Sequence, residues 1–473
     1  MSEYLHSSKE AGKLTRGSQR SKGRYQLMDL LLGDEMDIPR SNTLLTEQQK
    51  IAKLAAEAPG MCFTSLNHHL SFEWLKEAYK RTRKDGAVGT DKQTASSYEK
   101  DLDANLTSLL NRAKSGNYFA PPVRRIYIPK GNKRDDKRPI GIPTFEDKVL
   151  QRAVVMLLEP IYEQDFLECS YGFRRGRSAH DAVSAVQKYL IQTKGGWVLD
   201  VDLRKFFDTL KHSYLRDLLQ IRVRDGVVKR LIGKWLSAGV MEANNNISRQ
   251  DVGCPQGGVV SPILSNLYLH HVLDVWFHEM VKPRLKGDSF LIRFADDFLI
   301  VCKRKDDAKS ILNVIPKRFA KYGLAINQEK TKMVDFRLNP SRSDYPKSFD
   351  FLGFTFHWDK SRKGRDLVRC KTSKDRLSRS ITQTAEWCRR NRHTPISAQR
   401  AKLNSMLRGH YNYFGITGNY YSLNKFFRAV CRNWRKFLSS RCQRKTMSWN
   451  KFNKLTKVYP LVRPFMAHSV YKA

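Results

Sequence analysis

Apolar residues recur with two spacings along the chain, and together these spacings predict a mixed fold. Spacings of three and four residues, typical of amphipathic helices, predict helices across residues 46–110, 146–164, 178–192, 306–322 and most of 387–473. Alternating or unbroken apolar runs predict strands at 196–203, 290–301 and 349–358, and a β-hairpin across 124–143. Strands and helices do not alternate regularly, so the expected fold class is α+β, with basic helical flanks around a core sheet.

Two adjacent carboxylates, Asp296 and Asp297, interrupt the apolar run RFADDFLIV. Aspartate is common in tight turns because its side chain bonds nearby backbone N–H groups, so by itself this pair predicts a hairpin turn. In GWVLDVDLRKFFD, Asp200 and Asp202 share one face of a strand because side chains alternate with period two. Buried carboxylates are costly unless a cation pairs with them, so the two pairs predict a divalent cation between them. Mg²⁺ prefers carboxylate oxygens, and two such ions are typical of phosphoryl displacement.

Charge identifies the class of partner. The chain carries 86 Lys and Arg against 46 Asp and Glu, a formal net charge of +40, which favours polyanions. From Trp387 to Ala473 there are 19 basic residues and no acidic one, interleaved with aromatic residues. This mixture suits phosphate neutralisation and base stacking, and the alternative is a solvated basic tail whose aromatic residues form an ordinary small core. We expect this segment to bind nucleic acid.

Cysteine spacing and hydropathy exclude several other classes. The eight cysteines are scattered, and no pair has the CxxC spacing of a zinc or redox site. No apolar stretch has membrane length, and the N-terminus lacks the apolar centre of a signal peptide. We therefore expect no membrane partner and a reducing, cytoplasmic compartment. Residues 1–45 are polar and basic, and we expect an arm with little stable order there.

Five blocks follow one another in an informative order: VLDVDLRKFFD, CPQGGVVSPILSN, RFADDFLIV, GLAINQEKTKMV and FDFLGFTF. In this order they resemble the palm of a reverse transcriptase. Upstream, IPKGNKRDDKRPIGIPT and SYGFRRGRSAHDAV resemble fingers blocks of the group II intron-encoded subclass, and downstream LRGHYNYFGITGN is similar to its thumb, or maturase, region. The resemblance covers roughly residues 85–356, and it implies a right-hand polymerase with fingers, palm and thumb.

The resemblance also implies a division into domains. The expected parts are a basic arm, an N-terminal extension with the fingers, the palm, the thumb or maturase domain, and a short basic region like a DNA-binding segment. Their expected bounds are 1–45, 46–190, 191–362, 363–424 and 425–473.

Individual roles follow from the resemblance as well. Asp202, Asp296 and Asp297 would be catalytic and would hold two Mg²⁺ ions, or Mn²⁺ in their place, with the backbone of Leu203 as a further ligand. Asp200 would be secondary. The remaining roles concern the incoming dNTP: a steric gate against a ribose hydroxyl at Phe207, whose alternative is a core ring, and nucleotide contacts at Lys130, Arg138, Gln256, Gly257 and Lys330.

Contacts to template, primer or intron RNA are implied for a larger set of basic and aromatic residues. For the arginines of GFRRGR the alternative is surface solvation, and for the residues after Trp387 it is the solvated basic tail with a small aromatic core. The set is Arg174, Arg175, Arg177, Phe294, Arg408, Tyr411, Tyr413, Arg432, Arg435, Lys436, Arg441 and Arg444. Phe294 departs from the family pattern, in which tyrosine is usual, so altered primer positioning or fidelity is expected. The paired cysteines and histidines of an HNH endonuclease are also missing from the sequence, so second-strand cleavage is not expected.

The implied function is an RNA-directed DNA polymerase that binds intron RNA, assists splicing and copies intron RNA or another structured RNA into cDNA from a DNA primer. This activity would serve retrohoming, and it implies a cytoplasm of the bacterial type with nucleoid or ribonucleoprotein association. Two alternatives stay open, namely a related enzyme recruited to DNA repair or antiviral defence, and a splicing maturase that does not polymerise. The retained acids Asp202, Asp296 and Asp297 count against the last, because an RNA chaperone gains nothing from costly like-charge clusters.

Overall fold

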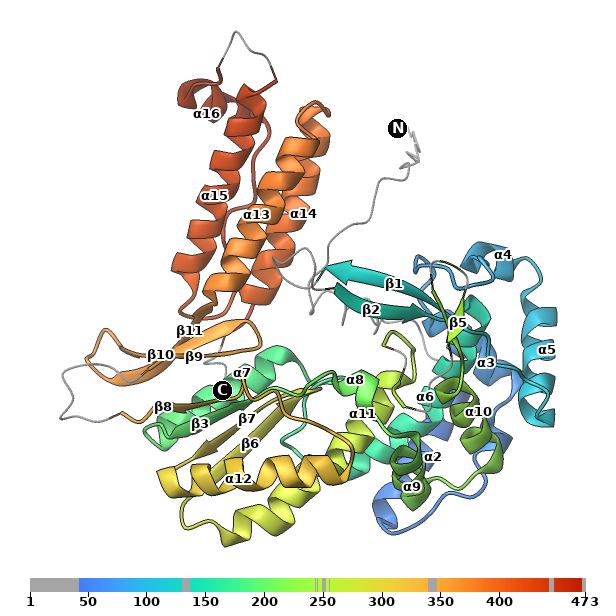
Figure 1. Ribbon diagram of the computed structural model, residues 1–473. Helices are drawn as coiled ribbons and strands as arrows, with labels where there is room; N and C mark the ends of the chain where they lie inside the picture. Colours follow the sequence, from blue (N-terminus) through green and yellow to red (C-terminus); the bar gives the residue numbers. More distant parts are fainter. Residues whose placement is uncertain are drawn as a thin grey trace, which may run out of the picture.

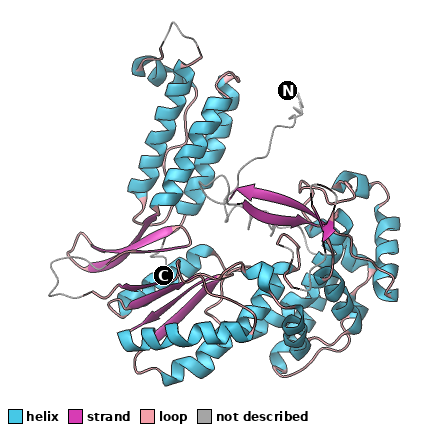
Figure 2. Cartoon of the chain, in the orientation of Figure 1, coloured by secondary structure: helices cyan, strands magenta, loops and turns pink. Residues whose placement is uncertain are grey.

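The computed structural model describes residues 42–129, 137–242, 244, 246–248, 252–254, 256–338, 347–441 and 446–469. Within these residues the chain forms three sheets with helices packed around them, which confirms the α+β expectation. Helices and strands are intermixed through most of the chain, whereas the C-terminal part is mainly helical (Figure 2). Most of the expected N-terminal arm lies outside the described residues. No helix in the described ranges is long and apolar enough to cross a membrane.

The N-terminal helices surround one long helix, as the helical spacing predicted. The apolar residues of this helix, α6, are buried through most of its length, and Thr144 caps its start by accepting the Asp147 N–H. Two of the earlier helices, α2 and α3, pack directly on α6. The elements are α2 (Asn42–Glu57), η1 (Asn67–His69), α3 (Phe72–Arg81), α4 (Ala95–Glu99), α5 (Leu102–Ser115) and α6 (Phe145–Asp165).

The predicted basic hairpin forms the first sheet. Strands β1 (Val123–Pro129) and β2 (Lys137–Ile142) pair antiparallel, with Ile126 opposite Ile140. β1 also pairs with β4 (Val240–Met241), which continues into β5 (Ile247–Ser248). The hairpin tip between β1 and β2, including Lys130, lies outside the described residues.

The central sheet is antiparallel, with strand order β6-β7-β3-β8, and its two faces belong to different cores. Leu199 and Val201 of β3 belong to a core shared with the N-terminal helices. Val198 of the same strand, with Leu299 of β7, belongs to a core shared with the C-terminal helices. The sheet is therefore buried on both faces, which explains its nearly continuous apolar sequence. The strands are β3 (Trp197–Val201), β6 (Ser289–Phe294), β7 (Asp297–Cys302) and β8 (Lys332–Asp335).

Helices of the middle of the chain cover this sheet. α7 packs on the β6 side and belongs to the core of the C-terminal helices, although the predicted division placed it with the fingers. α12 packs on β3 and β7, whereas α9 and α10 lie beside the N-terminal helices (Figure 1). The elements are α7 (Ala179–Gln192), α8 (Phe206–Thr209), α9 (His212–Arg222), α10 (Gly226–Leu236), α11 (Ser261–Leu269), the π-helix η2 (His270–Val281), η3 (Lys282–Arg284) and α12 (Lys305–Lys321).

The C-terminal part stands upright on a third sheet (Figure 1). The single strand predicted at 349–358 is wrong: the chain turns at Leu352 and Gly353, whose φ angles of 51° and 82° allow a tight turn between two strands. The elements are β9 (Phe349–Phe351), β10 (Phe354–Lys360), β11 (Asp366–Thr372), α13 (Lys374–Arg390), α14 (Ile396–Phe414), α15 (Tyr420–Ser439) and α16 (Trp449–Val458). The boundary expected between residues 424 and 425 falls inside α15, so the helix runs on without a break there.

The buried carboxylate of Asp225 joins the segment at Leu66 and Asn67 to the start of α10. One oxygen accepts the Leu66 and Asn67 N–H groups at 2.7 and 2.9 Å. The other accepts the Val228 N–H at 2.9 Å and so caps α10. One side chain therefore satisfies backbone donors of two distant segments.

We expect Asp225→Ala to lower the free energy of unfolding by about 3 kcal/mol, because three backbone donors lose a charged acceptor in a buried position. Urea-induced unfolding followed by circular dichroism measures this change. Asp101→Ala is the matched control, because among the described residues Asp101 precedes α5 without a capping side-chain bond. Its substitution should change stability by less than about 0.5 kcal/mol. Equal effects of the two substitutions would contradict the role of the Asp225 bonds.

Candidate active site and nucleic-acid interface

The turn that carries the paired acids has an uncommon backbone conformation. Phe294 of β6 pairs with Asp297 of β7, so Ala295 and Asp296 form a two-residue turn. Ala295 has a φ of 56°, a left-handed value that is costly for a residue with a Cβ. The predicted hairpin turn is therefore present, and its shape requires support from its surroundings.

Strand register brings the acids of β3 and β7 to the same end of the central sheet. Val201 is opposite Phe298. Asp202 is the next residue along the antiparallel register and therefore comes opposite Asp297. Side chains alternate, so Asp200, Asp202 and Asp297 share one face of the sheet, as the sequence predicted for the first two.

The pKa of Asp200 is raised by its burial and by the neighbouring acids. Burial, together with the charges of Asp297 and Asp202, raises the pKa of Asp200 to about 7. Lys332 stands opposite Asp200 on β8 and offsets this effect in part. The carboxylates therefore interact with one another, and a cation among them would lower the electrostatic cost of the cluster.

The segment before β8 supports Asp202. The Asp202 carbonyl accepts the Asn327 N–H at 2.8 Å, and Leu203, the expected backbone ligand, forms a bridge with Ile326. The exposed Lys330 ammonium lies 3.7 Å from an Asp202 oxygen. Lys330 thus lies beside the acidic cluster. There its charge can interact with the Asp202 carboxylate or with the phosphate of a bound substrate.

The donor set fits a hard divalent cation that is only partly bound by protein. Carboxylate oxygens of this kind suit Mg²⁺, which typically uses one or two protein carboxylates and takes its other ligands from phosphate and water. Within the described ranges, no three His, Cys, Asp or Glu side chains form a ready ligand group. The carboxylates that the register brings together, Asp202 and Asp297 with Asp296 in the adjacent turn, are the residues that could hold the ion.

The PQGG loop lies between the expected gate residue and the basic hairpin. The Cys254 N–H donates to the Phe207 carbonyl at 2.7 Å, and the Gly141 N–H of β2 donates to the Gln256 carbonyl at 2.7 Å. The Phe207 ring is partly buried and packs on the main core. The loop thus connects α8, next to the acids, to the hairpin that carries Arg138 opposite Ile128.

Comparison with known proteins identifies the family. The model described as "Reverse transcriptase (RNA-dependent DNA polymerase)" matches residues 128–356. The chain is 32% identical to Protein YkfC of Escherichia coli (strain K12) over 362 residues, 68% of this chain and 90% of YkfC. It is also 39% identical over 172 residues to the group II intron-encoded protein LtrA of Lactococcus lactis subsp. cremoris, 36% of this chain and 28% of LtrA. The chain belongs to the group II intron reverse transcriptase/maturase family.

Intron-associated RNA-directed DNA polymerase function, as expected from the motif order, is therefore confirmed at the level of the family. Reverse transcriptases use divalent metal ions, in agreement with the donor set described above. The match spans less than a third of LtrA. A structure of telomerase from Candida albicans in complex with a TWJ fragment of telomeric RNA covers 77% of this chain and 65% of that chain, at 14% identity. The TM-score of this match is 0.39.

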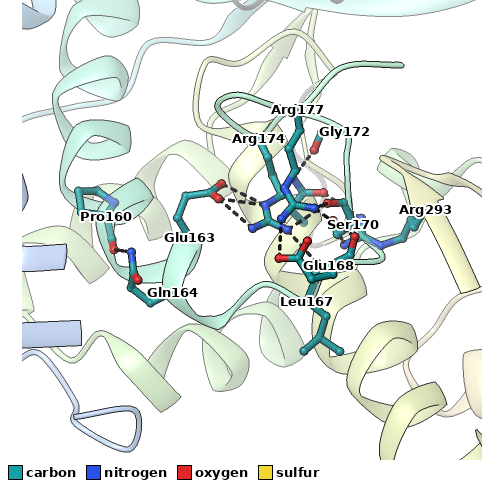
Figure 3. Close-up of polar contacts among 11 residues, drawn as sticks. Pro160, Glu163, Gln164, Leu167, Glu168, Ser170, Gly172, Arg174, Arg177 and Arg293 are labelled. Atoms are coloured by element: carbon teal, nitrogen blue, oxygen red, sulfur yellow. Dashed lines mark hydrogen bonds and ion pairs between the residues drawn. The ribbon is translucent and has the colours of Figure 1, made fainter. Parts of the chain in front are cut away.

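The three arginines expected at the template each bond to a carboxylate of the protein itself. Arg174 is buried, its Nε and Nη2 donate to Glu163, and its Nη1 donates to the Leu167 and Ser170 carbonyls (Figure 3). Arg177 pairs with Glu168 at 2.7 Å. Arg175 pairs with Glu159 at 3.3 Å. The burial of Arg174 leaves its guanidinium a structural role, which argues against a template contact.

Several aromatic residues expected to stack on nucleic acid lie in the core of the reverse transcriptase. Tyr411 is fully buried and Phe294 is 6% exposed. Tyr413 is partly buried, and its hydroxyl donates to the Leu352 carbonyl at 2.9 Å. These rings stabilise the protein interior, so base stacking by Tyr411 or Phe294 is not supported. The alternative of a small aromatic core is therefore correct for Tyr411.

The basic residues of the C-terminal helices divide into two groups. Arg435 donates to the Met447 carbonyl and stacks on Trp449. Arg441 donates to the Arg392 and Thr394 carbonyls. The exposed members of the expected set are Arg408, Arg432 and Lys436. Arg444 lies outside the described residues.

Two residues beside the acidic turn were not identified from the sequence. Arg293 is fully buried, and an added Cβ on Gly172 would lie 2.4 Å from the Ala295 nitrogen. A charged residue inside an apolar strand was an available signal for Arg293, because buried charges need partners. Gly172 gave no signal, since its contact is with a residue distant in sequence.

Gly257 explains why the PQGG loop needs glycine. Its φ is 122°, and an added Cβ would lie 2.4 Å from the Gly141 carbonyl oxygen of β2. We expect Gly257→Ala to lower kcat/KM for dNTP incorporation about tenfold or more, since such backbone strain costs ~1–3 kcal/mol and displaces the loop. Steady-state primer extension measures this change.

Gly233→Ala is the matched control, because among the described atoms an added Cβ there meets nothing within 4 Å. Gly233 lies inside α10, where alanine is favoured over glycine by about 0.5–1 kcal/mol. Its variant should keep kcat/KM within about twofold of the wild type. An unchanged kcat/KM in Gly257→Ala would show that the close approach does not constrain the loop.

Proposed function

We propose that this chain copies RNA into DNA at a two-metal site formed by Asp202, Asp296 and Asp297. The observation that carries the proposal is the β3–β7 register, in which Asp202 follows Val201 and so comes opposite Asp297. These acids lie within the matched reverse transcriptase region. Asp200 is a secondary member, and its burial, together with the charges of Asp297 and Asp202, raises its pKa.

Two Mg²⁺ ions, or Mn²⁺ in their place, would stabilise the charge on the attacking and leaving oxygens. The chain's own groups orient the reactants. Asp202, with the Leu203 backbone, and the Asp296–Asp297 turn hold their oxygens at the end of a rigid sheet. Lys330, which lies 3.7 Å from Asp202, contributes positive charge near the phosphates.

The incoming nucleotide would occupy the space among α8, the PQGG loop and the β1–β2 hairpin. Arg138 on β2 and Lys130 at the hairpin tip suit a triphosphate, as a forked donor and a point charge. Gln256 and Gly257 would lie beside the templating pair, and Phe207 would exclude a ribose 2′-hydroxyl. The hydrogen bond between the Cys254 N–H and the Phe207 carbonyl supports a shared location for these groups.

The larger assignment is a right hand in which the N-terminal helices and hairpin are fingers, the central sheet is the palm, and α13–α15 are the thumb or maturase domain. Intron RNA would bind the basic surface of the thumb, where Arg408, Arg432 and Lys436 are exposed. We propose on the same basis that the chain assists splicing and copies the intron at a DNA target. The family membership supports this proposal.

Asp296→Asn should lower primer extension on an RNA template with dNTPs and Mg²⁺ by at least about a thousandfold, because the substitution removes a metal-binding charge and keeps the side-chain size. Gel-resolved extension of a labelled DNA primer measures the loss. Asp306→Asn, at an exposed position at the start of α12, is the control and should retain full activity. Wild-type protein without extension activity, or equal activity of Asp296→Asn, would overturn the proposed site.

Phe207→Ala should raise ribonucleotide incorporation relative to dNTP incorporation by about tenfold or more, because removing the ring opens space for a 2′-hydroxyl. The ratio of kcat/KM values for dCTP and CTP measures the selectivity. Phe206→Ala is the control, since Phe206 is buried in the core next to Phe207 and should affect stability instead. An unchanged ratio in Phe207→Ala would make that ring a core residue.

A further inference from the structure

Arg293, in the strand that leads into the acidic turn, uses all five of its donors inside the protein. It is fully buried. Nε and Nη2 donate to the two Asp274 oxygens at 2.8 and 2.6 Å. Nη2 also donates to the Ser170 hydroxyl at 2.7 Å, and Nη1 to the Asn266 side chain at 2.9 Å. Nη1 also donates to the carbonyl of Ala295, a residue of the turn, at 3.1 Å.

This arrangement determines geometry more than it adds stability. A buried Arg–Asp pair gains little net free energy, because the desolvation of both charges offsets their attraction. The planar guanidinium instead fixes the direction of each partner. Asp274 lies in the π-helix η2, a rare conformation that is frequent at functional sites. The π-helix η2 therefore places the buried Asp274 carboxylate against β6, the strand that leads into the acidic turn.

Ser170 links the arginine to the GFRRGR segment. The Ser170 hydroxyl accepts from Arg293, and its carbonyl accepts from Arg174 and Arg177 at 3.0 and 3.4 Å. Figure 3 shows these guanidinium groups around Ser170, with Arg293 on the side of the sheet. Because Arg174 is itself held by Glu163, the Ser170 position is fixed from both sides.

The same segment contacts the turn through its backbone. The Tyr171 N–H donates to the Arg293 carbonyl at 2.8 Å, and Asn266 donates to the Gly172 carbonyl at 2.7 Å. An added Cβ on Gly172 would lie 2.4 Å from the Ala295 nitrogen. The left-handed residue Ala295 thus has Gly172 close to its nitrogen and the Arg293 guanidinium bonded to its carbonyl.

We propose that Arg293 is a positioning residue that fixes the Asp296–Asp297 turn relative to Asp202, with Ser170 and Gly172 as its support. Arg293 contacts no substrate, because it is wholly buried, and it acts through the Ala295 carbonyl. This inference rests on the proposed function. A displacement of about 1 Å at reacting groups can cost about a hundredfold in rate, so a support of this kind bears on kcat.

The test compares Gly172→Ala, Ser170→Ala and Arg293→Lys with the wild type in primer extension. We expect kcat to fall about 10- to 100-fold for Gly172→Ala and Arg293→Lys, and about 3- to 10-fold for Ser170→Ala, with KM for dNTP within about twofold. A second measurement omits substrate and follows Mn²⁺ binding by electron paramagnetic resonance. Gly172→Ala should weaken that binding about tenfold.

Arg337→Lys is the matched control. Arg337 also makes two hydrogen bonds to one aspartate, Asp335, at 2.9 Å each, but it is half exposed and lies at the opposite end of β3 from the acids. The control should keep kcat and Mn²⁺ affinity within about twofold of the wild type. Thermal unfolding of every variant defines a temperature at which all are fully folded, and the kinetics are measured there.

The outcomes distinguish a failure of the positioning role of Arg293 from a failure of the proposed polymerase function. Folded Gly172→Ala and Ser170→Ala enzymes with wild-type kcat and Mn²⁺ affinity would overturn the positioning role. So would a loss of kcat that disappears once each variant is fully folded, since that result indicates a purely structural residue. Wild-type protein without any primer extension would overturn the proposed function instead.

Discussion

The candidate active site depends on a central sheet that is buried on both faces. One face packs on the N-terminal core and the other on the core of the C-terminal helices, so carboxylates in the middle of β3 or β7 would be desolvated without compensation. The strand ends are where such charges become tolerable, because phosphate, water and a cation can reach them. Asp202 and Asp297 stand at those ends, and the apolar residues behind them keep the two strands in register.

Backbone contacts determine much of the geometry around these acids. Gly172 approaches the backbone of the Ala295 turn, and Gly257 approaches the carbonyl of Gly141, each at a distance that excludes a Cβ. Side chains in these places would move the turn or the loop away from the sheet. The first contact joins the central sheet to the SYGF segment, and the second joins the PQGG loop to the β1–β2 hairpin. The acids are therefore held by parts of the chain that are far apart in sequence.

The sequence predicted the features that have local causes. Alternation predicted the β1–β2 hairpin, an apolar run predicted β3, helical spacing predicted α6, and the cost of paired acids predicted that Asp202 and Asp297 lie near each other. Two features escaped prediction. The turn at Leu352 and Gly353 divides an apolar run that has the pattern of one strand, and the support of Ala295 by Gly172 and Arg293 depends on tertiary contacts.

Charge and aromatic content predicted a nucleic-acid partner more reliably than they predicted the contacting residues. A strongly basic protein must still satisfy many of its own carboxylates and carbonyls, and Arg174 and Arg441 are used in this way. Tyr411 likewise contributes to the core of the C-terminal helices. A guanidinium whose donors are already engaged in the interior would have to break those bonds before it could bind a phosphate. Under the proposed function, RNA affinity would come from exposed positions such as Arg408 and Lys436, so burial as well as charge has to be considered in choosing contact residues.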